Sequence, residues 1–219
     1  FIPLNLLSEY TKEDGTKDYG LMSWSIKNGY PRVSVNTTGV RSESIDYTKL
    51  ITAPFDYINL LTALDDFKDV INSEKDCIRR VDCLNNKFVD GKRTDEIYVQ
   101  ATVYFIKDKE GVIYISVIEQ GKQKLKFKVA AKGYVRFYDA QGNVIDNEGE
   151  KSKRFALKYL EVLKMLMEDE LKIDAKYQSI KNNNSSVVKP SNPDIEVPTK
   201  IVTTKVETDS FDLDKMLEL

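Results

Sequence analysis

Histidine is absent from this 219-residue chain, and cysteine occurs only twice, as Cys77 and Cys83. Without an imidazole the chain has no Ser–His or Cys–His pair, no histidine ligand for zinc and no side chain that titrates near neutrality at its ordinary pKa. Two sulfurs are too few for a disulfide framework or a four-ligand zinc site. We therefore expect reduced thiols in a cytoplasmic protein, with no metal and no cofactor.

Two further absences argue against a membrane-spanning protein and against an ATP-driven enzyme. No run of apolar residues approaches the length that spans a bilayer. The phosphate-binding pattern Gly-x-x-x-x-Gly-Lys-[Ser/Thr] does not occur, which argues against an ATP-driven helicase or recombinase. Paired carboxylates are present but show no metal-binding spacing: Asp65-Asp66, Asp95-Glu96, Asp108 with Glu110, and Glu148 with Glu150. The chain is predicted not to be an enzyme, with a metal-dependent nuclease as an alternative.

Acidic residues are missing from one long window, although the whole chain is nearly balanced at 33 basic and 35 acidic residues. From Gln120 to Tyr138 there is no Asp or Glu. Within that window the lysines of residues 122–129 alternate with Leu125, Phe127 and Val129. Successive side chains of a β-strand point to opposite faces, so this alternation predicts a strand with ammonium groups on one face and apolar groups on the other.

Aromatic residues accompany these cations. Tyr134 and Tyr138 flank Arg136, Tyr30 is close to Arg32, and Tyr98, Tyr104 and Tyr114 fall on expected strands. A basic sheet face with aromatic rings suits a single-stranded nucleic acid, which needs its phosphates neutralised and its bases stacked. An edge strand protected from aggregation by lysine is the alternative. The predicted nucleic-acid-binding residues are Lys122, Lys124, Lys126, Lys128, Lys132, Arg136, Tyr134, Tyr138, Tyr30 and Arg32. Tyr98 and Tyr104 have the same parity and are expected to share a face.

Turn residues and apolar spacing predict the secondary structure. Asn28-Gly29 predicts a hairpin of residues 19–26 and 30–36, followed by a strand over 47–52. An amphipathic helix is expected over 54–72, opened by Pro54, and a second over 151–173. Between them the turns at Asp90-Gly91, 108–111 and 120–121 separate strands, the last three of which (96–107, 112–119 and 122–129) form a meander. A further hairpin is expected over 133–145.

This pattern predicts an α+β protein, mainly antiparallel β, with an OB-like barrel, two amphipathic helices and a disordered C-terminal tail. Residues 1–178 form one domain, 179–203 a flexible linker rich in Asn, Ser and Pro, and 204–219 an acidic tail. The tail places apolar residues among its acids, which is typical of a short partner-binding motif: Asp209, Phe211, Asp212, Leu213 and Asp214. A tethered acidic tail can also compete with a polyanion for a basic face.

This organisation resembles phage-encoded single-stranded-DNA-binding proteins, which combine an OB-type body with an acidic, aromatic-containing tail. The resemblance covers most of the chain and includes segments 21–35 and 51–56 besides the linker and Asp209 to Asp214. It implies a protein that coats single-stranded DNA during phage replication and recombination, in the cytoplasm of an infected bacterium. It also implies that the tail recruits replication or transcription proteins. The residues alone leave open a protein–protein adaptor, such as a transcription co-activator.

Overall fold

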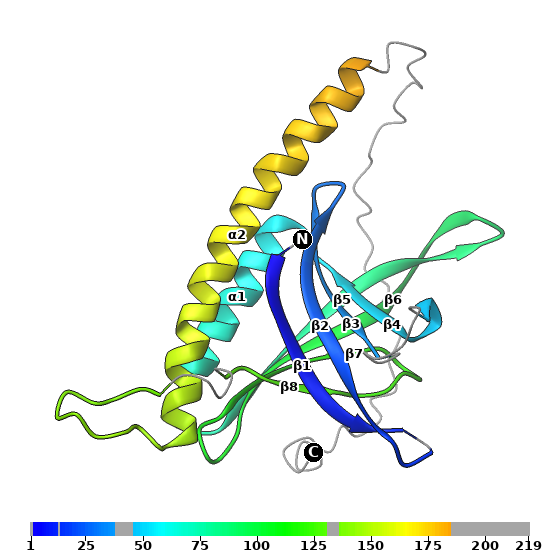
Figure 1. Ribbon diagram of the computed structural model, residues 1–219. Coiled ribbons are helices and arrows are strands. Elements are labelled where there is room, and N and C mark those ends of the chain that lie inside the picture. Colours follow the sequence, from blue (N-terminus) through cyan, green and yellow to red (C-terminus); the bar gives the residue numbers. More distant parts are fainter. Residues whose placement is uncertain (1, 13, 38–45, 131–135, 185–219) are drawn as a thin grey trace.

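The chain passes twice through four antiparallel strands followed by a helix (Figure 1). The computed structural model describes residues 2–12, 14–37, 46–130 and 136–184. The first half contains β1 (Ile2–Thr11), β2 (Lys17–Lys27), β3 (Tyr30–Asn36), a 3-10 turn (Tyr47–Lys49), β4 (Leu50–Pro54) and α1 (Tyr57–Asn72). The second half contains β5 (Cys77–Val89), β6 (Lys92–Lys107), β7 (Ile113–Ile118), β8 (Lys126–Lys128) and α2 (Glu148–Asn184).

The described strands form two four-stranded sheets, in the orders β1-β2-β3-β4 and β5-β6-β7-β8. They do not close into one barrel, so the prediction of an OB-like barrel is wrong, while the α+β class with mainly antiparallel strands and two helices is confirmed. The sequence interpretation lacked β1 and left β5 ambiguous. With eight strands, each half completes its own sheet, and the two sheets bury their apolar faces together with the helices.

Side-chain hydrogen bonds join the two sheets at their edges. The Ser8 hydroxyl of β1 donates to the Lys126 carbonyl of β8 at 2.8 Å. The Gln100 side chain of β6 donates to the Thr52 carbonyl of β4 at 3.3 Å. Gly20 pairs with Ser8 at the β1–β8 contact, and a Cβ on it would lie 2.1 Å from the Leu125 Cδ1, so any larger residue would force the Leu125 side chain to move.

The core lies between the inner faces of the sheets and the two helices. In α1, Phe67 stacks on Phe105 of β6 with ring centroids 4.9 Å apart. Trp24 of β2 is 0% exposed, and its indole Nε1–H donates to the Tyr159 hydroxyl of α2 at 2.9 Å. Tyr159 in turn donates to the Leu4 carbonyl at 3.0 Å, which joins α2 to both β1 and β2.

Two predicted hairpin turns are confirmed. Asn28 and Gly29 have φ values of 54° and 79°, and Asp90 and Gly91 have 51° and 76°. Two consecutive left-handed residues give the type I′ turn, whose twist matches that of the flanking strands. The second turn closes the β5–β6 hairpin, which projects from the body of the molecule (Figure 1).

The first helix begins later than Pro54. Pro54 is instead the last residue of β4, opposite Arg32 of β3. Asp56 caps the helix by accepting a hydrogen bond from the Asn59 backbone N–H at 2.8 Å. At the other end, buried Lys107 donates to the Ile71 carbonyl at 3.4 Å, where a cation is favoured by the helix dipole.

The second helix is longer than predicted. Asn147 caps it by accepting from the Glu150 N–H at 2.8 Å, and the helix runs through Asn184, into the start of the expected linker. Its C-terminal half extends beyond the sheets (Figure 1). Residues 131–135 and 185–219 lie outside the described residues, and with them the acidic tail and part of the predicted hairpin. Within the described ranges, no helix has the length and apolarity needed to cross a bilayer.

Candidate nucleic-acid interface

The second sheet has one face in the main core, and its opposite face carries a smaller buried cluster of Tyr104, Ile106 and Ile118. Ala101, Val103 and Phe105 of β6 belong to the core, so the alternate residues of β6 point to the opposite face. We call this opposite face the outer face. By the strand register it carries Ile78, Arg80, Asp82, Thr102, Tyr104, Ile106, Tyr114, Ser116, Ile118, Lys126 and Lys128.

Two rows of directly paired residues cross the outer face from β5 to β8. One row is Arg80, Tyr104, Ser116 and Lys126. The next row is Ile78, Ile106, Tyr114 and Lys128. The register thus brings an arginine, two tyrosines and two lysines onto one face, from four strands that are separate in the sequence.

The predicted alternation of the lysine segment is confirmed. Leu125, Phe127 and Val129 are buried, whereas Lys124 and Lys128 are exposed and Lys126 is half-buried. The regular strand is shorter than predicted and covers only Lys126–Lys128. Backbone pairing with Tyr114, Ile115 and Ser116 of β7 holds these three residues, and the chain leaves the ladder on both sides.

Lys126 lies against an aromatic ring rather than alone in solvent. Its ammonium is 4.6 Å from the centroid of the Tyr114 ring. A cation over a tyrosine face is held by the ring quadrupole. Burial raises the pKa of Tyr114 to about 12, with the Asp108 carboxylate adding to the effect, so the ring stays a neutral phenol. This pair presents a charge and a flat surface at the same point of the outer face.

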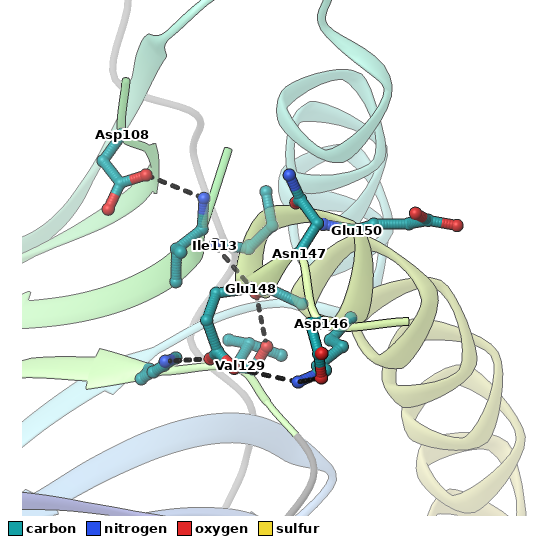
Figure 2. Close-up of polar contacts among 11 residues, drawn as sticks. Asp108, Ile113, Val129, Asp146, Asn147, Glu148 and Glu150 are labelled. Carbon is teal, nitrogen blue, oxygen red and sulfur yellow. Dashed lines mark hydrogen bonds and ion pairs between the residues drawn. The ribbon is translucent and has the colours of Figure 1, made fainter. Parts of the chain in front are cut away.

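Lys128 is paired with a carboxylate. The Glu148 carboxylate at the start of α2, labelled in Figure 2, is 2.8 Å from the Lys128 ammonium and 3.3 Å from the Lys151 ammonium. Hydrogen bonds and charge from these lysines lower the pKa of Glu148, which therefore stays ionised. The charge of Lys128 is largely balanced by its partner, so Lys128 contributes less positive potential than the sequence alone implies.

Lys122 lies away from the outer face. Its ammonium donates to the Leu50 carbonyl at 2.7 Å and pairs with Glu119 at 2.8 Å. It borders a groove of about 850 Å³ between the β1–β2 hairpin and the turn before β8, together with Lys12 and Lys49. Lys12 pairs with Asp18 at 2.6 Å, and Asp14 also lines the groove, so these lysines add little net positive charge there.

A β-bulge separates Tyr98 from Tyr104. Cys83 pairs with Ala101, but the next residue, Leu84, pairs with Val99, so Gln100 is the extra residue on β6. Because one residue is inserted, the side chains beyond the bulge change face. Tyr98 therefore points away from the face of Tyr104, and the prediction that these two rings share a face is wrong. Residue parity fails across a bulge because it assumes an unbroken ladder.

Other predicted site residues lie elsewhere. Tyr30 and Arg32 belong to β3 of the first sheet, and the turn preceding Tyr30 lies beside Asp174 of α2. The exposed Arg136 and Tyr138 belong to the hairpin between β8 and α2, where Tyr138 pairs with Val144. The structure does not bring these four residues onto the outer face. Lys132 and Tyr134 lie outside the described residues.

Arg80 was missing from the sequence interpretation. It lies on β5 at the end of the row that contains Tyr104 and Lys126, and its Nε is 2.9 Å from the Asp82 carboxylate. The signal was available in the sequence, because Ile78, Arg80 and Asp82 alternate with Cys77, Arg79, Val81 and Cys83. This alternation did not lead to a predicted face because residues 77–83 were not predicted to form a strand.

The carboxylates considered for a metal site do not gather. In the described part of the chain, no group of three or more His, Cys, Asp or Glu side chains lies close enough to hold a metal ion. Glu148 and Glu150 lie at the start of α2 (Figure 2). Glu150 pairs with Arg154 at 2.6 Å, and Glu148 pairs with Lys128 and Lys151. Asp108 accepts from the Val112 backbone N–H at 2.7 Å instead.

Comparison with protein-family models, with curated proteins and with solved structures finds no match for this chain.

Proposed function

We propose that this protein binds single-stranded DNA on the outer face of its second sheet and has no catalytic activity. The supporting observation is the row of Arg80, Tyr104, Ser116 and Lys126 across four strands. Phosphates need cations that are spaced along a surface, and unstacked bases need flat apolar groups beside them. One β-sheet face supplies both, because every second residue of each strand points to it.

The roles follow from exposure. Lys124 and Lys126 contact phosphates, and Tyr114 offers its half-buried ring to a base, whereas Arg80 is paired with Asp82 at 2.9 Å. Tyr104 is only 4% exposed, so its ring supports Tyr114 and Arg80 from below in this conformation. Coating of single-stranded DNA in replication or recombination, of the kind carried out by phage-encoded proteins, is the role that this surface and the acidic tail together support.

The C-terminal tail is the second part of the proposal. Residues 204–219 carry five acidic residues against two lysines and lie at the end of a chain whose body has the basic outer face. A tethered polyanion has a high effective concentration near that face, so it competes with DNA until DNA displaces it. Once displaced, Phe211 and Leu213 become available to replication or transcription proteins.

The test of the DNA-binding surface is a titration with fluorescent oligo-dT over a series of salt concentrations. For single strands, log affinity falls with log salt by about 0.7 per neutralised phosphate. Changing both Lys124 and Lys126 to Ala should lower the affinity and reduce this slope by about 1.4. The matched control changes Lys158 and Lys172 to Ala; both are exposed cations of α2, which contributes no strand to the outer face. The slope should be unaffected in the control.

If the salt dependence of the affinity is unchanged in the Lys124→Ala/Lys126→Ala protein, these lysines protect a sheet edge and do not bind phosphate. Failure of the unmodified protein to bind oligo-dT at low salt would favour the adaptor function instead. Cleavage of the strand in Mg²⁺ that EDTA abolishes would favour the nuclease.

Deletion of Glu207 to Leu219 tests the tail. Oligo-dT affinity should rise at low salt, and the gain should shrink as salt screens the attraction between tail and body. Equal affinities of the full and truncated proteins at low salt would refute competition by the tail.

A further inference from the structure

β5 has a long edge that the described strands leave unpaired. It is thirteen residues long and is the outermost strand of its sheet. The other edge strands contact the opposite sheet, β1 and β8 through Ser8 and Lys126, and β4 through Thr52 and Gln100. No strand among the described residues pairs with the outer edge of β5. An unpaired edge offers a row of backbone N–H and C=O groups to another strand.

Neither proline nor a short length protects this edge. Natural edge strands are usually blunted by proline, by charged side chains or by being short. β5 has thirteen residues and no proline, and its charges are of both signs: Arg79, Arg80, Asp82 and Lys87. Large apolar side chains are also exposed along it, with Leu84 at 59% and Phe88 at 63%. Such an edge is built for a partner strand.

We propose that β5 pairs antiparallel with β5 of a second copy of this chain, centred on Val81, to give a two-fold dimer with one continuous sheet. A two-fold axis normal to the sheet brings the same strand from each copy together in opposite directions. Directly opposed residues then share a face. The centre of symmetry must therefore fall on a residue of the strand, and the charges along β5 decide which residue.

Centring on Val81 makes the outer-face side chains complementary. Arg80 then lies opposite Asp82 of the partner subunit, and symmetry repeats this pair. Ile78 lies opposite Leu84 of the partner subunit, which covers the exposed Leu84. Arg80 and Asp82 already attract each other within one strand at 2.9 Å, so both charged ends lie at the same height above the sheet. Opposite charges and apolar pairs directly across two strands stabilise the pairing.

The neighbouring registers are unfavourable. Centring on Arg80 would place Arg80 opposite its own copy, and centring on Asp82 would do the same for Asp82. Like charges directly opposite one another destabilise a strand pair. Of the three registers centred on Arg80, Val81 and Asp82, only the one centred on Val81 avoids like charges across the axis.

The inner face gives a second, independent complementarity. In the Val81 register, Arg79 lies opposite Cys83 of the partner subunit. Beside Cys83, a groove of about 400 Å³ runs between β5 and α1 and is lined by the carboxylates of Asp56 and Asp66. Arg79 is exposed and points to this inner face. The dimer thus places a cation at the mouth of an acidic groove.

The test uses two charge reversals, separately and mixed, in sedimentation velocity. The unmodified protein should sediment as a dimer. Arg80→Asp alone and Asp82→Arg alone place like charges across the interface, so each should dimerise at least about tenfold more weakly. An equimolar mixture of the two should recover the dimer, because each copy then faces the opposite charge. Loss of the ion pair within each strand cannot explain recovery in the mixture. Lys109→Asp, a charge reversal in the turn before β7, is the control and should leave the dimer intact.

Register is tested by a single cysteine. Opposed residues of antiparallel strands have Cα atoms about 4.5–5.5 Å apart, within the range of a disulfide. Val81→Cys in a Cys77→Ser background should form a disulfide between the two copies under mild oxidation, and Lys87→Cys in that background should not. Burial raises the pKa of Cys83 to about 12, so Cys83 stays an unreactive thiol in both proteins. A monomeric unmodified protein at about 100 µM, or a mixture no more dimeric than the single variants, would overturn the proposal.

Discussion

Replacing Tyr159 with Phe tests the polar link inside the core. The Tyr159 hydroxyl accepts from the Trp24 indole at 2.9 Å and donates to the Leu4 carbonyl at 3.0 Å. Phe keeps the ring and removes both hydrogen bonds. Trp24 is 0% exposed, so water cannot replace the lost partner of the indole N–H. Such an unsatisfied buried donor costs about 1–3 kcal/mol.

The Leu4 carbonyl contributes less. Leu4 is only half-buried, and its carbonyl can turn to solvent, so we add at most about 1 kcal/mol for it. The free energy of unfolding should fall by about 1–4 kcal/mol in total, a sizeable part of the 5–15 kcal/mol typical of a domain.

Urea unfolding followed by tryptophan emission is the direct assay, because Trp24 is the only tryptophan. With a slope of about 2–3 kcal/mol per molar urea, the midpoint should fall by about 1 M at constant slope. Tyr138→Phe is the control, since Tyr138 is exposed and the same hydroxyl is removed from a hairpin. A loss below about 0.5 kcal/mol in Tyr159→Phe would refute the reasoning, because it would mean that the indole N–H finds another partner.

Three further predictions follow from single contacts. Gly20→Ala should lower the free energy of unfolding by about 1–3 kcal/mol, because the new Cβ would collide with the Leu125 side chain. In a double-mutant cycle, adding Leu125→Ala to Gly20→Ala should therefore cost less than Leu125→Ala alone. Glu148→Gln should raise oligo-dT affinity and steepen its salt dependence by up to about 0.7, since Lys128 loses its partner; an equal slope would mean that Lys128 never reaches phosphate. Lys164→Gln should raise the pKa of Asp65 toward the ordinary value of an aspartate in a carboxyl NMR titration, because the Lys164 ammonium, at 2.9 Å, now lowers it. Because the folded-state pKa is the lower one, this pair stabilises the protein above pH about 4 and its contribution fades as pH falls, so the variant should lose that part of the pH dependence.

Local chemistry was readable from the sequence. The Asn28-Gly29 and Asp90-Gly91 turns, the apolar face of α1 and the alternation of Lys124, Leu125 and Lys126 all depend on residues that are neighbours in the chain. Turn type and side-chain alternation follow from backbone geometry over a few residues, so they survive whatever the rest of the molecule does. The α+β class follows from the same local signals.

Tertiary structure decided which of these elements meet. Tyr104, Tyr114 and Lys126 share a face only because the ladders β6–β7 and β7–β8 have the register that they have, and a bulge at Gln100 removed Tyr98 from that face. Lys128 acquired a carboxylate partner from a helix twenty residues further along the chain. Register, bulges and contacts between distant elements are set by the packing of the whole core, which no short stretch of sequence encodes. The same packing buries Trp24 and brings β1, β8 and β4 against the opposite sheet. Among the described strands, none pairs with the outer edge of β5.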